Sequence, residues 1–207
     1  MTQTGDPDRI HPAARLFARE LAAGQMDRRE FLTRATALGL SSAAAYSLGG
    51  LAHPVRAEEA PQGAEDATLR IQMEVRPVSD PRTADWAEIA NFTRGWLEYL
   101  VEYNRDGSVR GMLLERWEVS DDATEYVLHV RPGIVWNNGD PFTATDVARM
   151  FRYWCDRDVE GNSMAGRLAS LVDRETGQLL DGAVTVEDPL TLRLHLPTPD
   201  VTLIVGL

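Results

Sequence analysis

Three stretches of the chain alternate apolar and polar residues with a period of two, which is the pattern of strands with one buried face. They run over residues 68–76, 126–131 and 190–196, and a shorter apolar element lies at 112–117. In the first stretch one face carries four apolar side chains: Leu69, Ile71, Met73 and Val75. We therefore predict a sheet built from these segments.

Two further stretches repeat apolar residues at intervals of three and four, which is the helical period. From Asp85 to Val101 the repeat predicts a helix of about four to five turns, ended by a turn signal at 104–107. Farther along, Thr143 and Asp146 stand in the spacing of a capping box and predict a helix that runs through Trp154. Residues 137–140 tolerate positive φ and predict a sharp turn just before it.

Residues 1–57 differ from the rest of the chain in charge and in amino-acid composition. They hold seven Arg against five acidic residues, whereas the whole chain carries a net charge of −11, so a positive leader precedes an acidic body. The uncharged run 35–52 is rich in Ala, Gly, Ser and Leu, and it is followed by the small-x-small pattern of Val55 to Ala57. This order of basic region, weakly apolar stretch and small residues is that of a secretory signal.

The leader resembles the twin-arginine type of signal, in which two adjacent arginines precede a bulky apolar pair. The matching residues are Arg28, Arg29, Phe31 and Leu32. We therefore expect export to the periplasm through the twin-arginine translocase, cleavage after Ala57, a polar linker over 58–67 and a mature part over 68–207. A retained membrane anchor and an ordinary helix are the alternatives, since 18 uncharged residues reach the lower edge of membrane-spanning length.

Upstream of the arginine pair, four apolar residues fall at helical spacing and predict an amphipathic helix without chemistry of its own. They are Ala13, Leu16, Phe17 and Leu21.

The amino-acid composition excludes several kinds of catalysis and binding. All 21 basic residues are arginine, which excludes mechanisms that need a Schiff-base or P-loop lysine. The acidic body argues against nucleic acid as a partner, because binding to phosphates needs a basic face. Cys155 is the single cysteine, so no intramolecular disulfide forms, and a lone cysteine is more often a small buried side chain than a nucleophile.

Motifs for catalysis are missing from the sequence. The four histidines are isolated and show no metal-ligand spacing, and we find neither a nucleophile elbow nor a dinucleotide fingerprint. We therefore expect no cofactor, no metal and no enzymatic activity. An exported enzyme remains the alternative from another functional class, because the twin-arginine route often serves cofactor-bearing oxidoreductases.

The block from Arg131 to Val147 resembles the signature stretch of the family 5 extracellular solute-binding proteins, which are the peptide-, dipeptide- and nickel-binding components of ABC importers. Three flanking passages agree with that family: 106–122, 184–192 and the first predicted strand followed by 79–81. The resemblance thus covers residues 68–205.

The resemblance implies an α/β fold of the periplasmic-binding-protein type (type II), in which two lobes close on a ligand about a hinge and hand it to the permease subunits. Peptides are the commonest ligands of the family, and nickel, sugars and opines use the same scaffold. Because family members are much longer, we expect residues 68–207 to be the N-terminal part of the domain, an incomplete first lobe. A truncated fragment without binding activity is therefore another alternative.

The resemblance also points to the end of the first predicted strand as a place of ligand contact. The residues are Glu74, Val75, Arg76 and Pro77, which would pair with a peptide backbone in the manner of a strand. The competing interpretation is a solvated strand end. The tryptophans at 96, 136 and 154 suit either a pocket wall or the core, and the core is the commoner place for them.

Overall fold

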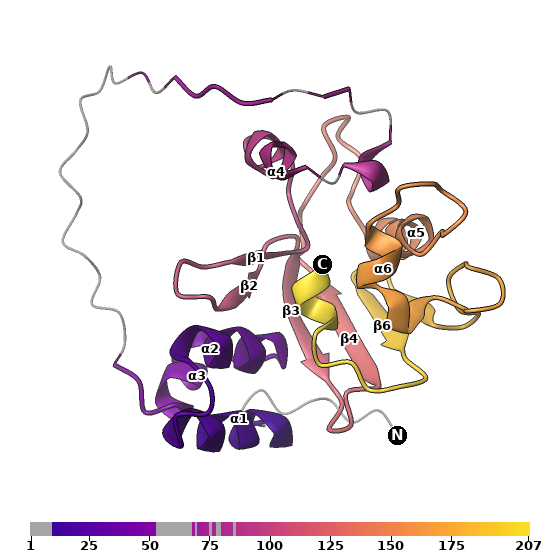
Figure 1. The fold of residues 1–207 in the computed structure, drawn as a ribbon. Helices are drawn as coiled ribbons and strands as arrows, with labels where there is room; N and C mark the ends of the chain where they lie inside the picture. The colour runs from indigo at the N-terminus through magenta and orange to yellow at the C-terminus, as the bar shows by residue number, and fades with distance from the viewer. Residues whose placement is uncertain (1–9, 53–67, 69, 75, 78–79, 85) are drawn as a thin grey trace.

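A computed structural model describes residues 10–52, 68, 70–74, 76–77, 80–84 and 86–207. Three N-terminal helices lie beside a small hairpin and one edge of a larger sheet, while the helices that follow the sheet's second strand cover its other end (Figure 1). The predicted cleavage site after Ala57 and the predicted linker 58–67 lie outside the described residues.

The larger sheet is antiparallel, with the strand order β3-β4-β6-β5. Its strands are β3 (Leu114–Val119), β4 (Glu125–Val130), β6 (Thr191–His195) and β5 (Val184–Asp188). Tyr126 lies opposite Leu194 and Leu128 lies opposite Leu192, and all four side chains are buried. The alternation at 126–131 and at 190–196 therefore predicted two strands correctly, and the apolar element at 112–117 overlaps the first part of β3.

Helix α5 (Ala144–Trp154) packs on this sheet. The carboxylate of Asp146 accepts a hydrogen bond from the Thr143 backbone N–H at 2.8 Å, which confirms the predicted cap. Val147, Phe151 and Cys155 are buried against the sheet. The short helices α6 (Met164–Arg167), η2 (Ala169–Leu171) and η3 (Leu203–Gly206) complete this core.

A two-stranded hairpin, β1 (Val101–Tyr103) with β2 (Val109–Gly111), precedes the sheet. Gly107 closes its turn by donating its backbone N–H to the carbonyl oxygen of Asn104 at 3.0 Å, at a φ of 91° that glycine tolerates without strain. The predicted turn at 104–107 is thereby confirmed.

The predicted helix over 85–101 is wrong in most of its length. Only α4 (Ala87–Thr93) is helical, after the 3-10 turn η1 (Pro81–Thr83), and Val101 already belongs to β1. Gly95 is a weak helix former, and Val101 is buried as a partner of β2. Trp96 is 64% exposed, so the apolar repeat does not mark one buried face.

The prediction of a strand over 68–76 is not supported either. None of the described residues in this range is assigned to a strand, and Ile71, on the predicted buried face, is 66% exposed. Alternation marks a face that suits burial, but a strand also needs a neighbour to pair with.

The leader forms three helices: α1 (Pro12–Ala22), α2 (Arg28–Ala37) and α3 (Ser42–Leu48). Asp27 caps α2 by accepting from the Glu30 N–H at 2.8 Å, and Ser41 caps α3 by accepting from the Ala44 N–H at 3.2 Å. The amphipathic prediction for α1 holds for Phe17, which is buried, but not for Leu16, which is 46% exposed.

The uncharged run 35–52 is divided between α2 and α3 by the tight turn at Gly39. Among the residues that the structure describes, no helix is both long and apolar enough to cross a membrane.

We predict that Leu194→Ala lowers the free energy of unfolding by about 2–5 kcal/mol, because it removes a fully buried side chain from the centre of the sheet. Urea denaturation measures the change. The matched control is Val186→Ala on β5, where the side chain is exposed and the expected loss is below about 1 kcal/mol. Equal losses for the two variants would contradict the assignment of the core.

Candidate functional site

The segment predicted to contact ligand, 74–77, carries a pair of opposite charges. The guanidinium of Arg76 donates to both carboxylate oxygens of Glu74, at 3.0 and 3.2 Å, and lies 5.7 Å from the ring centre of Trp86. Hydrogen bonding to Arg76 holds the pKa of Glu74 below its usual range. Both side chains are more than half exposed, so the pair is reachable from solvent. Val75 lies outside the described residues, and the role of the segment stays a prediction.

Just beyond this segment, Arg82 joins residues 80–83 to the end of α5. Its guanidinium donates to both oxygens of Asp80, at 3.0 and 2.6 Å, and lies 3.5 Å from a carboxylate oxygen of Asp156. It also lies 5.7 Å from the ring centre of Tyr153. Hydrogen bonds from Arg82 hold the pKa of Asp80 below its usual range. The cluster fixes residues 80–83 against the body of the domain.

Sequence reasoning included Asp80 only as part of a family passage and missed Arg82 and Asp156. An Asp-x-Arg spacing is too common to be a signal by itself. The pairing with Asp156 joins residues 74 positions apart, and only the fold shows it.

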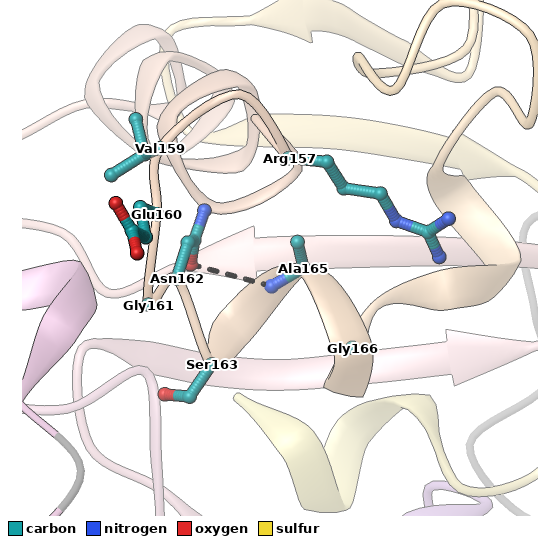
Figure 2. A pocket seen from close by; sticks show the side chains of 8 residues that line it. All are labelled: Arg157, Val159, Glu160, Gly161, Asn162, Ser163, Ala165 and Gly166. Atoms are coloured by element: carbon teal, nitrogen blue, oxygen red, sulfur yellow. Dashed lines mark hydrogen bonds between the residues drawn. The ribbon is translucent and has the colours of Figure 1, made fainter.

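A shallow hollow of about 390 Å³ lies in the loop between α5 and α6. Its lining is Arg157, Val159, Glu160, Gly161, Asn162, Ser163, Ala165 and Gly166. Figure 2 shows Arg157 and Glu160 pointing to opposite sides of it, so their charges do not converge on one point. None of these residues was predicted as a site.

Asn162 fixes the shape of this loop. Its amide nitrogen donates to the Asp156 carbonyl oxygen at 2.6 Å, while its amide oxygen accepts from the N–H groups of Met164 and Ala165 at 3.1 and 3.4 Å (Figure 2). These two bonds satisfy the first backbone N–H groups of α6. The hydrogen bonds of Asn162 are therefore used to hold the loop in shape.

The three tryptophans do not surround a pocket together. Trp96 and Trp136 are 64% and 45% exposed, and each makes an edge contact with a phenylalanine, Phe92 at 5.9 Å and Phe142 at 5.3 Å. Only Trp154 packs against the core, next to Phe151. The core interpretation thus holds for Trp154 and fails for the other two.

The histidines and the cysteine that the structure describes make no reactive cluster. Among the described residues, no group of three or more His, Cys, Asp or Glu side chains could hold a metal ion. His11 contacts the Ser120 carbonyl oxygen at 2.8 Å, which is a structural contact. Cys155 is fully buried, and burial raises the pKa of its thiol to about 12, so it is a poor nucleophile at neutral pH.

The residues of the arginine motif lie on α2, in two different environments. Phe31 and Leu32 are fully buried, whereas Arg28 and Arg29 are exposed. The guanidinium of Arg28 lies 5.2 Å from the ring centre of Tyr46 and donates to its hydroxyl at 3.2 Å. Burial and the hydrogen bond to Asp106 raise the pKa of Tyr46. Sequence reasoning found the motif but not its contacts.

Comparison with known proteins identifies the second half of the chain. Residues 108–207 match the model of the bacterial extracellular solute-binding proteins, family 5 Middle. The chain is 31% identical to the oligopeptide-binding protein OppA of Bacillus subtilis, over 65% of this chain and 26% of that protein. It is 28% identical to the periplasmic oligopeptide-binding protein OppA of Haemophilus influenzae, over 77% of this chain and 31% of that protein. The chain thus spans about a quarter to a third of the length of these relatives.

A solved structure shows the fold. The murein tripeptide binding protein MppA of Escherichia coli superposes with a TM-score of 0.52 at 22% identity, over 60% of this chain and 26% of that one. The matched part of the chain therefore has the α/β fold of part of a periplasmic binding protein. The relatives named here are binding proteins.

We predict that the Cys155 thiol in the native chain reacts with a thiol reagent at pH 8 more than about a hundredfold slower than an exposed thiol, because burial disfavours the thiolate and blocks access. The reference is the variant Cys155→Ala with Ser163→Cys, which places a thiol on the exposed loop. Absorbance during labelling with a chromogenic disulfide measures both rates. Fast labelling of native Cys155 would show that the site is open.

Proposed function

Because the chain belongs to the family 5 extracellular solute-binding proteins, we propose that it is the substrate-binding component of an ABC importer for peptides or similar small solutes. The observation that carries this proposal is the family match over residues 108–207. Two relatives named for oligopeptide binding support the ligand class. The protein would deliver its ligand to the permease subunits and would perform no chemistry on it.

The exposed charge pair at 74–77 suits a peptide ligand. A peptide carries an amine at one end and a carboxylate at the other, and Glu74 and Arg76 offer one complementary charge to each. Backbone pairing with an extended segment adds affinity that is independent of side-chain identity. Arg82 supports the site indirectly, since its ion pairs with Asp80 and Asp156 fasten the chain directly after it.

For the N-terminal part, we propose that residues 1–57 are a twin-arginine signal that is cleaved after Ala57, with a linker over 58–67 and the mature part over 68–207. The motif Arg28, Arg29, Phe31 and Leu32 supports this division. The translocase would be a partner during export, and the periplasm the place of function. The Haemophilus influenzae relative is named as a periplasmic protein.

We predict that a pool of di- to pentapeptides raises the melting temperature of the purified chain, because a ligand that binds only the folded state stabilises it by mass action, by about 2.7 kcal/mol at a hundred times Kd. Arg76→Ala should weaken binding at least about tenfold, since it removes a charged hydrogen-bonding partner. Thermal scans with titrated peptide measure both effects.

Arg174→Ala is the control for that series, since Arg174 is an exposed arginine in another loop. It should leave the peptide response unchanged. If no peptide shifts the melting temperature of the parent chain, the peptide-binding proposal fails. If Arg76→Ala and Arg174→Ala respond alike, binding occurs elsewhere.

We predict that Arg28→Lys together with Arg29→Lys abolishes export in a bacterial host with an intact twin-arginine system, because that route reads the arginine pair itself. Cell fractionation and immunoblotting measure the periplasmic share. Arg19→Lys on α1 is the matched control and should be exported normally. Unchanged export of the double variant would show that another route carries the protein.

A further inference from the structure

Helix α2 is joined to the folded domain by two buried hydrogen bonds. The Thr36 hydroxyl oxygen accepts from the backbone N–H of Val109 at 2.8 Å, and the indole N–H of Trp117 donates to the carbonyl oxygen of Ala37 at 2.9 Å. Thr36 is fully buried. Removing one partner of a buried hydrogen bond leaves the other unpaired, so these contacts favour a specific docked position.

The turn between β1 and β2 is held by both α2 and α3 (Figure 1). The Thr33 hydroxyl donates to the Gly107 carbonyl oxygen at 2.6 Å, and the Tyr46 hydroxyl donates to a carboxylate oxygen of Asp106 at 2.6 Å. The hydroxyl oxygens of Ser42 and Ser108 lie 3.4 Å apart. Residues 106–108 of the turn therefore all contact α2 or α3.

Two glycines let the surfaces approach this closely. A Cβ atom on Gly39 would lie 2.9 Å from the Trp117 carbonyl oxygen, and one on Gly107 would lie 2.3 Å from Cγ of Arg29. A Cβ atom this close would force the neighbouring atoms to shift, so glycine suits both contacts.

Docking has a consequence for the arginine motif. Phe31 and Leu32, its apolar half, are fully buried in a cluster that α1, α2 and α3 form with one another, including Leu38 and Tyr46, and Val119 of the domain packs against this cluster. Arg28 is engaged by Tyr46, which in turn is held by Asp106. The arginines stay at the surface, but the four residues are not presented together.

We propose that residues 10–52, here called the N-terminal segment, are an intramolecular partner of the folded domain, and that docking holds α2 and α3 together over the apolar half of the arginine motif. The docking goes beyond the proposed function. Its effect on export rests on the proposed twin-arginine signal. In the docked state a receptor meets two exposed arginines without Phe31 and Leu32, so recognition of the complete motif requires the segment to undock and its helices to separate.

The test uses the proximity of Ser42 and Ser108. In the full chain with Cys155→Ala, the pair Ser42→Cys and Ser108→Cys should form a disulfide on mild oxidation of the native protein and fail to do so in urea, because the two hydroxyl oxygens are 3.4 Å apart only in the fold. The control pair is Ser42→Cys with Ser163→Cys, and it should not close. If the first pair does not cross-link in the native chain, the docking proposal is wrong.

The cross-linked chain then tests masking. Offered to inverted membrane vesicles that carry the twin-arginine translocase, the oxidised form should be transported at least about tenfold less than the same chain after reduction. Equal transport of the two forms overturns the masking. If the reduced form is not transported either, the export proposal fails and the masking with it, whereas the docking is still decided by the cross-link.

Thr36→Val gives a second test that needs no cross-link. It leaves the buried Val109 N–H without its acceptor, so amide hydrogen exchange over 28–38 and 106–109 should rise at least about tenfold. Thr176→Val, in an exposed loop, should leave exchange there unchanged. Equal exchange in Thr36→Val and the parent chain would contradict docking through this contact.

Discussion

The fold depends on the double pairing of strand β4. It is hydrogen-bonded to β3 on one side and to β6 on the other, and its buried residues Tyr126, Leu128 and Val130 face the core that α5 covers. Because side chains alternate between faces, a slip of one residue would expose all three, so the register is strongly fixed. The hairpin β1–β2 is positioned through the same sheet, since the Leu114 N–H donates to the Leu100 carbonyl oxygen.

Strands β4 and β6 could be predicted from the sequence because they lie where alternation and burial coincide. The alternation at 68–76 is just as regular, yet none of its described residues is in a strand. A pattern specifies which face suits burial, while pairing depends on a partner far along the chain. The same limit explains α4: the apolar repeat continues past Gly95, but Val101 gains more from pairing with β2 and from burial than from one more helical turn.

The candidate site was predicted from the family resemblance and not from the pattern of apolar and polar residues. The segment 74–77 came from the family's passages, and the cluster of Arg82 with Asp80 and Asp156 was missed because Arg82 and Asp156 are 74 positions apart. The arginine motif could be recognised in the sequence, because its four residues lie within five consecutive positions. The contacts of Thr36 with Val109 and of Ala37 with Trp117 could not be predicted, because neither segment carries a sequence signal for the other.

The composition of the leader fits a reversible docked state. The run 35–52 is mostly Ala, Gly, Ser and Leu, and residues 33–46 are joined to 106–109 and Trp117 by several polar contacts. A net gain of about 0.5–1.5 kcal/mol for each such hydrogen bond amounts to only a few kcal/mol in total. A contact of that strength keeps the segment docked most of the time and still lets it open without unfolding the sheet. Mild apolarity thus suits both an export signal and a removable partner of the folded domain.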